Sequence, residues 1–232
     1  GESPEAAART VRYRAFAGFV KQGDCLLTAH HQDDQAETLL IQLLRGAGPR
    51  GLAAMPLVSD FGEGWHARPL LGIARSELEV YAKENNLSWV DDESNFDTGY
   101  DRNFLRHEIF PLLKKRFPAT AATLSRTSTL CAEAADLLAD SASNDYRPIL
   151  VSDNTFSANA LHDFGEIRAR NVLHQWFRDN HYPTPTAAQM QRIWEDVVCT
   201  SDESCPLVTW SEVEVRRYRD VIYVSMAIKH HN

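Results

Sequence analysis

The 232-residue sequence contains no run of about 18 consecutive apolar residues, so we expect no transmembrane helix and no membrane partner. Its first residues carry neither the basic stretch nor the apolar stretch of a signal peptide. Cysteine is scarce, with four residues in no metal-like spacing, which favours reduced thiols in a cytoplasmic protein. The chain is 44% hydrophobic and 24% charged, values that exclude a disordered or fibrous protein.

An excess of positive charge is also lacking. The formal net charge is −8, and the deficit is spread along the chain. Residues 1–116 contain 14 Lys and Arg against 17 Asp and Glu, and residues 117–232 contain 10 against 15. Neither half is a basic domain, so any contact with nucleic acid must come from local clusters of positive charge.

Short apolar runs alternate with helical patterns in the first half of the chain, which indicates an α/β fold with a parallel, Rossmann-like sheet. The apolar run 25–29 predicts a buried strand of that sheet. The glycine-rich segment 46–51 and the polar segment 91–100 are expected to be loops. We expect further strands at 65–70 and 87–90, and helices at 6–20, 34–44, 75–86 and 102–116, the last broken at Pro111.

The pattern changes after Pro118, where we place a domain boundary, so that the domains are 1–118 and 119–232. Thr186 and Gln189 form a capping box at the start of a helix. The second domain is expected to be mainly helical and to end in a small β-hairpin or meander. The predicted helices are 119–142, 161–180 and 186–198, and the predicted strands are 207–210, 212–218 and 221–226.

The densest cluster of polar residues contains His30, His31, Asp33, Asp34 and Glu37, where a predicted strand ends and a helix begins. Ligands of open α/β sheets bind at the carboxyl ends of the strands, and helix N-termini favour phosphate. Two carboxylates there can hold a magnesium ion that bridges phosphates. A purely structural alternative is that the aspartates cap the helix. A second functional alternative is a two-metal hydrolase.

Arginine pairs form the second group of candidates. Arg102 and Arg106 are four residues apart, so they share a helix face and could grip a phosphate or carboxylate. Local pairing with Asp97 or Asp101 is the structural alternative. Arg9 and Arg12 also share a face, although on pattern alone a solvated charged surface explains them better. The basic run at Arg216 and Arg217 could meet a phosphate backbone, or could be an ordinary surface.

Six segments stand in the order known from one protein family: 5–14, 28–38, 45–52, 68–70, 92–95 and 100–106. They resemble the tRNA(Ile)-lysidine synthetases, which are PP-loop ATP pyrophosphatases, and 212–218 is similar to a part of their C-terminal region. The match covers 1–116 closely and 117–232 more loosely. The resemblance implies a ligase that forms a C–N bond. It would use ATP to adenylate C2 of the wobble cytidine of isoleucine tRNA with a CAU anticodon, and L-lysine would then displace AMP.

The resemblance also implies roles for individual residues. Asp33 or Asp34, with Asp34 favoured, would bind magnesium-ATP or the lysine ammonium. Arg102, Asn103 and Arg106 would hold the activated tRNA or the lysine carboxylate. The remaining implied contacts are Arg9, Arg12, His30 and His31 with ATP, and Arg45, Arg50, Asn95, Arg216 and Arg217 with tRNA.

One motif of the family does not occur in the sequence. The pyrophosphate loop, Ser-Gly-Gly-x-Asp-Ser, lies N-terminal to the first helix of this chain in the family. We therefore expect an N-terminally incomplete PP-loop domain, without the last C-terminal domain of the family, that is inactive on its own. The exposed sheet edge would be covered by the missing segment, by a partner or by a second copy in a homodimer.

Two other functions remain open. One is a non-catalytic tRNA-binding fragment, which would bind tRNA in a salt-dependent way without turnover. The other is a different PP-loop tRNA-modifying enzyme such as a thiolase, which the unclustered cysteines disfavour.

Overall fold

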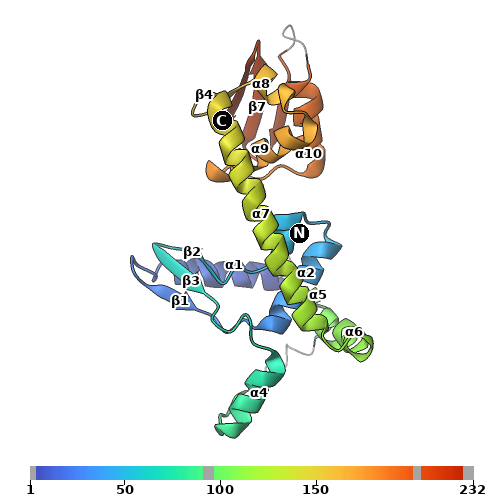
Figure 1. Cartoon of the computed structure of the whole chain (residues 1–232). Helices are drawn as coiled ribbons and strands as arrows, with labels where there is room; N and C mark the ends of the chain where they lie inside the picture. Colours follow the sequence, from blue (N-terminus) through green and yellow to red (C-terminus); the bar gives the residue numbers. More distant parts are fainter. Residues whose placement is uncertain (1–3, 91–96, 201–204, 227–232) are drawn as a thin grey trace. The chain divides into compact units, whose positions relative to one another are not determined.

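The computed structural model describes residues 4–90, 97–200 and 205–226 (Figure 1). The chain divides into two compact units, Gly1–Ala135 and Asp136–Asn232. The division falls inside the long helix α7 (Thr120–Ile149), which confirms the predicted helix and extends it. The domain boundary predicted at residue 118 stays a prediction, because the start of α7 packs within the first unit. Among the described residues, none of the helices is both long and apolar enough to cross a membrane.

The first unit contains a three-stranded sheet of order β1-β3-β2, formed by β1 (Cys25–Leu27), β2 (Val58–Phe61) and β3 (Gly64–Ala67). β1 and β3 are parallel, as predicted, with Leu26 opposite His66. β2 was not predicted and pairs antiparallel to β3 through a two-residue turn. The predicted burial of β1 is wrong, since Leu27 is 64% exposed. Within the described residues, β1 is paired along one edge only.

The predicted strand at 87–90 is wrong as well. This segment has no regular structure, and its side chains are exposed. The helix predicted at 75–86 is present as α4 (Arg75–Glu84), and Asn86, with φ of 52°, follows its end. An apolar tetrapeptide without a neighbouring strand gains no ladder hydrogen bonds, so its β-propensity alone does not form a strand.

The other helices of the first unit largely follow the predictions. α1 (Pro4–Ala17) stops three residues before the expected end, and the predicted loop 46–51 contains the short helix α3 (Pro49–Leu52), with Pro49 in its first turn. A π-helical segment, η2 (Leu105–Ile109), lies between α5 (Asp101–Phe104) and α6 (Phe110–Arg116). The helix therefore changes its geometry directly before Pro111, where a break was predicted. α2 spans Gln32–Leu44, so it ends where predicted and begins two residues earlier.

The second unit is built on a five-stranded antiparallel sheet of order β4-β5-β8-β7-β6. β6 (Leu207–Trp210), β7 (Val213–Tyr218) and β8 (Val221–Met226) confirm the predicted hairpin and meander. β4 (Leu150–Ser152) and β5 (Thr155–Ser157) were missed, because three residues are too few to show alternation.

Helices cover this sheet and close its core. The predicted helix 161–180 is two helices, α8 (Ala158–Asp163) and α9 (Glu166–Asp179), separated at Gly165 with φ of 74°. The capping box of Thr186 and Gln189 is confirmed at the start of α10 (Ala187–Arg192), which continues as the π-helical η3 (Ile193–Val198). α9 packs on the sheet through edge-to-face ring contacts, Phe156–Trp176 and Phe177–Trp210.

Candidate active site

The site is built on the first turns of α2. His31 is the N-cap residue, and its Nδ1 accepts the backbone N–H of Asp34 at 3.4 Å. In return, Asp34 Oδ2 accepts the backbone N–H of His31 at 3.0 Å. This reciprocal cap starts the helix and fixes the direction in which the Asp34 carboxylate points. Asp34 thus caps the helix, as the structural alternative predicted, but capping uses only one of its oxygens.

The other oxygen of Asp34 belongs to a buried charged group. Arg106 donates to Asp34 Oδ1 at 3.0 Å and binds both oxygens of Glu37, at 2.7 and 2.8 Å. Glu37 is 2% exposed, whereas the side chain of Arg106 is 22% exposed, so the carboxylate of this two-pronged pair is buried and the guanidinium group is partly exposed. The hydrogen bonds that Arg106 donates to Glu37 are the main reason why the pKa of Arg106 is raised above its ordinary value.

Arg102 completes this group on the neighbouring turn. It donates to Thr38 Oγ1 at 2.8 Å, and its Nε lies 3.7 Å from Glu37 Oε2. Thr38 in turn donates to the backbone oxygen of Asp34 at 2.8 Å. Both arginines therefore reach one face of α2, as their four-residue spacing predicts. We call Asp34, Glu37, Arg102 and Arg106 the charge cluster.

Glu37 was not predicted as a site residue. It belongs to the polar cluster of the sequence, in which the aspartates are the predicted ligands. Its spacing was the available signal, because Glu37 lies three residues after Asp34 and so on the same helix face. Its burial depends on the approach of η2 and α6, which the sequence alone does not show.

Asp33 faces a different set of partners. Lys114 Nζ lies 2.6 Å from its Oδ1, and its Oδ2 accepts the backbone N–H of Arg75 at 3.0 Å. Burial by itself would raise the pKa of Asp33, but the hydrogen bond from Lys114 and that from Arg75 lower it below the ordinary value. Asp33 therefore caps the N-terminus of α4, where Ala74 has no side-chain cap of its own.

The carboxylates do not form a prepared metal site. All four oxygens of Asp33 and Asp34 accept from protein donors. Among the described residues there is no group of three or more His, Cys, Asp or Glu side chains that could hold a metal ion. This arrangement does not fit a resident magnesium ion, and it gives no support to the two-metal hydrolase.

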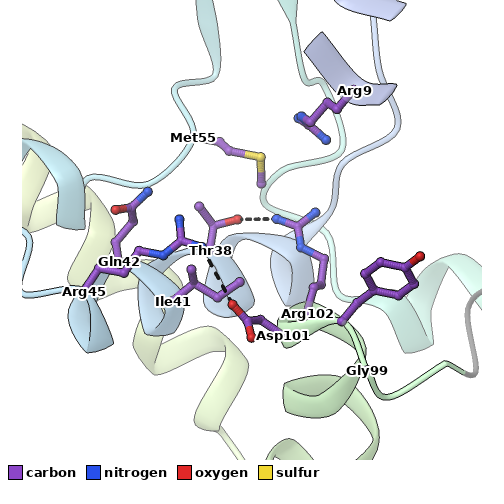
Figure 2. A pocket seen from close by; sticks show the side chains of 10 residues that line it. Arg9, Thr38, Ile41, Gln42, Arg45, Met55, Gly99, Asp101 and Arg102 are labelled. Atoms are coloured by element: carbon purple, nitrogen blue, oxygen red, sulfur yellow. Dashed lines mark hydrogen bonds and ion pairs between the residues drawn. The ribbon is translucent and has the colours of Figure 1, made fainter. Parts of the chain in front are cut away.

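A cavity of about 380 Å³ adjoins the charge cluster (Figure 2). Three arginines of the sequence prediction, Arg9, Arg45 and Arg102, line it, and Arg45 lies 3.8 Å from Asp101. Three guanidinium groups around one cavity suit an anionic ligand such as a phosphate. The remaining lining residues are Thr38, Ile41, Gln42, Met55, Gly99, Tyr100 and Asp101.

His30 lies close to these arginines. Burial is the largest cause that lowers its pKa to about 4, and the charges of Arg9, Arg68 and Arg102 lower it further, against the carboxylate of Asp34. His30 is therefore neutral at pH 7 and can offer a hydrogen bond without adding a charge.

Other predicted residues lie elsewhere. Arg12 is exposed on α1, and Asn103 donates to the backbone oxygen of Asp97 at 2.9 Å. Arg50 is exposed at the short helix α3. Asn95 lies outside the described residues.

The two arginines of the second unit differ from each other. The side chain of Arg216 is 56% exposed and pairs with Glu214 at 2.9 Å, so it can meet a ligand. Arg217 is 4% exposed and donates to backbone oxygens of Val198 and Thr200 at 2.8 and 2.7 Å. It caps the end of η3, which corrects its prediction as a tRNA contact. Strand alternation explains the difference, because adjacent residues of β7 face opposite sides of the sheet.

Comparisons with known proteins add to this geometry. A PP-loop domain matches residues 1–113, and a TilS substrate binding domain matches residues 156–223. The tRNA(Ile)-lysidine synthase of Coxiella burnetii is 40% identical over 232 residues, which are 100% of this chain and 51% of that protein. That of Methylococcus capsulatus is 44% identical over 226 residues, 97% of this chain and 52% of that protein.

A third relative gives the same result. The tRNA(Ile)-lysidine synthase of Photobacterium profundum is 42% identical over 223 residues, 96% of this chain and 51% of that protein. The chain thus spans about half the length of the curated relatives it matches. Both matched domains and the likeness along nearly the whole chain confirm the resemblance seen in the sequence: the chain is similar to the tRNA(Ile)-lysidine synthases and matches a PP-loop domain and a TilS substrate binding domain.

Proposed function

We propose that the chain is part of a ligase that attaches L-lysine to C2 of the wobble cytidine of isoleucine tRNA with a CAU anticodon. ATP would first adenylate the C2 carbonyl oxygen, and the lysine ε-amine would then displace AMP. The observation that carries the proposal is the buried charge cluster on α2 and η2 beside an arginine-lined cavity, in a chain that matches tRNA(Ile)-lysidine synthases.

The charges of the site suit this chemistry. Adenylation of a weakly nucleophilic carbonyl needs neutralisation of phosphate charge more than it needs a strong base. Arg9, Arg45 and Arg102 would supply that neutralisation at the cavity. Planar guanidinium groups also suit the phosphates of an RNA loop.

The charge cluster suits an amino acid. It holds two carboxylates and two guanidinium groups, so its formal charge is zero. The ammonium and carboxylate groups of lysine could exchange partners with it and leave no buried charge uncompensated. We therefore propose that Asp34 and Glu37 bind the ammonium, and that Arg102 and Arg106 bind the carboxylate.

Magnesium would enter with the nucleotide. Asp33 and Asp34 already carry cationic partners, so the metal would be held mainly by phosphate oxygens, with one carboxylate released from its partner. The proposed use of tRNA and ATP is consistent with the cytoplasmic location that the low cysteine content favours.

The decisive experiment measures transfer of labelled lysine to a tRNA transcript by the polypeptide that carries this chain. A transcript with uridine at the wobble position is the matched control. We expect lysine transfer that requires ATP and the wobble cytidine. Glu37→Gln should abolish transfer, whereas Glu79→Gln, on the exposed face of α4, should leave it unchanged.

A non-catalytic tRNA-binding module is the second candidate, favoured by the exposed Arg216 and by the arginines of the cavity. It predicts an affinity for tRNA that falls steeply with salt and no lysine transfer. Transfer of lysine by the same preparation would exclude it.

A further inference from the structure

A hydrogen-bond relay joins four polar side chains, from Arg68 and His66 at the end of β3 to Thr28 and His30 after the end of β1. Arg68 Nη2 lies 3.1 Å from His66 Nδ1, and His66 Nε2 lies 2.8 Å from Thr28 Oγ1. Thr28 Oγ1 also lies 2.8 Å from His30 Nδ1. The parallel register of β1 and β3 brings these residues together, and the Thr28 N–H continues it by donating to Ala67 O at 3.1 Å.

The direction of each hydrogen bond in this relay follows from chemistry. A guanidinium group can only donate, so His66 Nδ1 must accept and its proton sits on Nε2. His66 Nε2 then donates to the Thr28 hydroxyl, whose single proton is left for His30 Nδ1. His30 Nδ1 is therefore an acceptor, and the proton of the neutral His30 ring sits on Nε2.

The first members of the relay are held rigidly. His66 is 2% exposed and Arg68 is 8% exposed. Arg68 Nη1 donates to Pro56 O at 2.8 Å, which fixes the guanidinium group. The ring of His66 packs against Tyr13 and Phe61, each with a centroid separation of 5.7 Å.

The last member faces the arginines of the site. Arg9 acts on His30 from α1, Arg68 from the residue directly after β3, and Arg102 from α5. Asp34 acts on it from α2 with a charge that Arg106 already compensates. Among the described residues, His30 Nε2 has no hydrogen-bond partner, so its proton is available to a ligand.

We propose that Arg68, His66 and Thr28 are positioning residues that lock His30 as the Nε2–H tautomer, and that this N–H donates to a phosphate oxygen of the substrate beside Arg9 and Arg102. The inference deepens the proposed function, since it names the phosphate-binding chemistry of the same site. The phosphate could belong to ATP or to the tRNA, and the experiment separates these sources.

The tautomer is measured directly by nitrogen-15 NMR of the histidine rings in the free chain. The His30 signals are assigned by comparison with His30→Gln. We expect an unprotonated Nδ1 and a protonated Nε2 for both His30 and His66. Because this reading needs neither substrate nor turnover, it is independent of whether the chain takes part in lysidine formation. Protonation of His30 at Nδ1 would overturn the proposal.

The phosphate donor role is tested by adding inorganic pyrophosphate, as a probe for ATP, or an anticodon stem-loop RNA. The His30 Nε2 signal should shift on addition of pyrophosphate if the phosphate belongs to ATP, and on addition of the stem-loop if it belongs to the tRNA. Thr28→Val should leave a mixture of His30 tautomers and weaken binding of that probe in inverse proportion to the Nε2–H fraction that remains, about twofold for an equal mixture. Thr28→Ser keeps the hydroxyl and should restore both the tautomer and the affinity. No shift with either probe, or equal binding by Thr28→Val and the native chain, would contradict the donor role.

Discussion

Glu37 carries the most buried carboxylate of the charge cluster, and both of its oxygens bind Arg106. Glu37→Gln would leave the guanidinium group of Arg106 with Asp34 as its remaining carboxylate partner at hydrogen-bond distance. Breaking a buried ion pair costs about 3–5 kcal/mol, and the retained Asp34 contact places the expected loss near 3 kcal/mol. Urea unfolding of the first unit would measure this loss.

The control for this prediction is a pair of the same type at the surface. Glu79 pairs with Arg75 on α4 at 2.8 Å, and both side chains are about half exposed. Glu79→Gln should change the free energy of unfolding by about 0.5 kcal/mol or less. Equal losses in the two variants would show that burial does not set the strength of the Glu37–Arg106 pair.

Asp33 predicts a dependence of stability on pH. Its pKa is lower in the folded chain than the ordinary value of 3.8, so the unfolded chain takes up the proton first. The stabilisation is fully present above about pH 4 and is lost as the pH falls through the lowered folded pKa. The difference in unfolding free energy between the native chain and Asp33→Asn should therefore shrink on acidification. In a Lys114→Gln background, which lacks the donor to Asp33, the difference in unfolding free energy caused by Asp33→Asn should shrink less on acidification. If acidification left that difference unchanged in the native background, the lowered pKa of Asp33 would be contradicted.

The residues of the site could be predicted only where their spacing in the sequence decides their position. Arg102 and Arg106 share a face because they are four residues apart in a helix. His66 and Arg68 could not be found in this way, because their contacts with Thr28 and His30 depend on the register of two strands far apart in the sequence. The hydrogen bonds of Asp33 with Arg75 and Lys114 likewise depend on where α4 and α6 approach α2.

At the scale of elements, Gly165 decides where α8 ends and α9 begins. Its φ of 74° and ψ of 162° lie in a region that is essentially restricted to glycine. A Cβ atom there would meet nothing within 4 Å, so any cost of Gly165→Ala comes from the backbone. We expect a loss of about 1–3 kcal/mol, measured by urea unfolding of the second unit.

Gly72 supplies the comparison. A Cβ atom at Gly72 would also meet nothing within 4 Å, and its φ is not in the positive range. Gly72→Ala should therefore change the stability of the first unit by about 0.5 kcal/mol or less. A loss in Gly165→Ala no larger than this would mean that the turn adapts to a side chain at little cost.

Elements with a local chemical signal were predicted well, and elements that depend on partners were not. The capping box of Thr186 and the apolar alternation of β7 and β8 depend only on residues close together in the sequence, so a short window shows them. β5 exists because it pairs with β8, and β4 because it pairs with β5, whereas 87–90 has an equally apolar pattern and no neighbouring strand among the described residues. The prediction of a single helix at 161–180 was wrong because Gly165 adopts a backbone conformation that a helix cannot contain, and this conformation does not show in the amino-acid composition of the segment.

At the scale of the whole molecule, the described residues form two separate apolar cores of unequal size. The core of the second unit has 19 buried apolar residues among those described, including Trp176 and Phe177, whereas a cluster of the first unit has four. Apolar burial is the main stabilising contribution to folding, so we expect the second unit to unfold at the higher temperature. Its amide hydrogens should also exchange more slowly than those of the first unit.

Leu161→Ala tests whether the two cores are energetically separate. Leu161 is fully buried in the second core, and its truncation should cost that unit about 2–5 kcal/mol. Calorimetry should show a lower melting temperature for the second unit and an unchanged transition for the first. Ile167→Ala, at a position that is 83% exposed on α9, is the matched control and should leave both transitions in place. If both transitions move together in Leu161→Ala, the continuous helix α7 couples the two units into one cooperative structure.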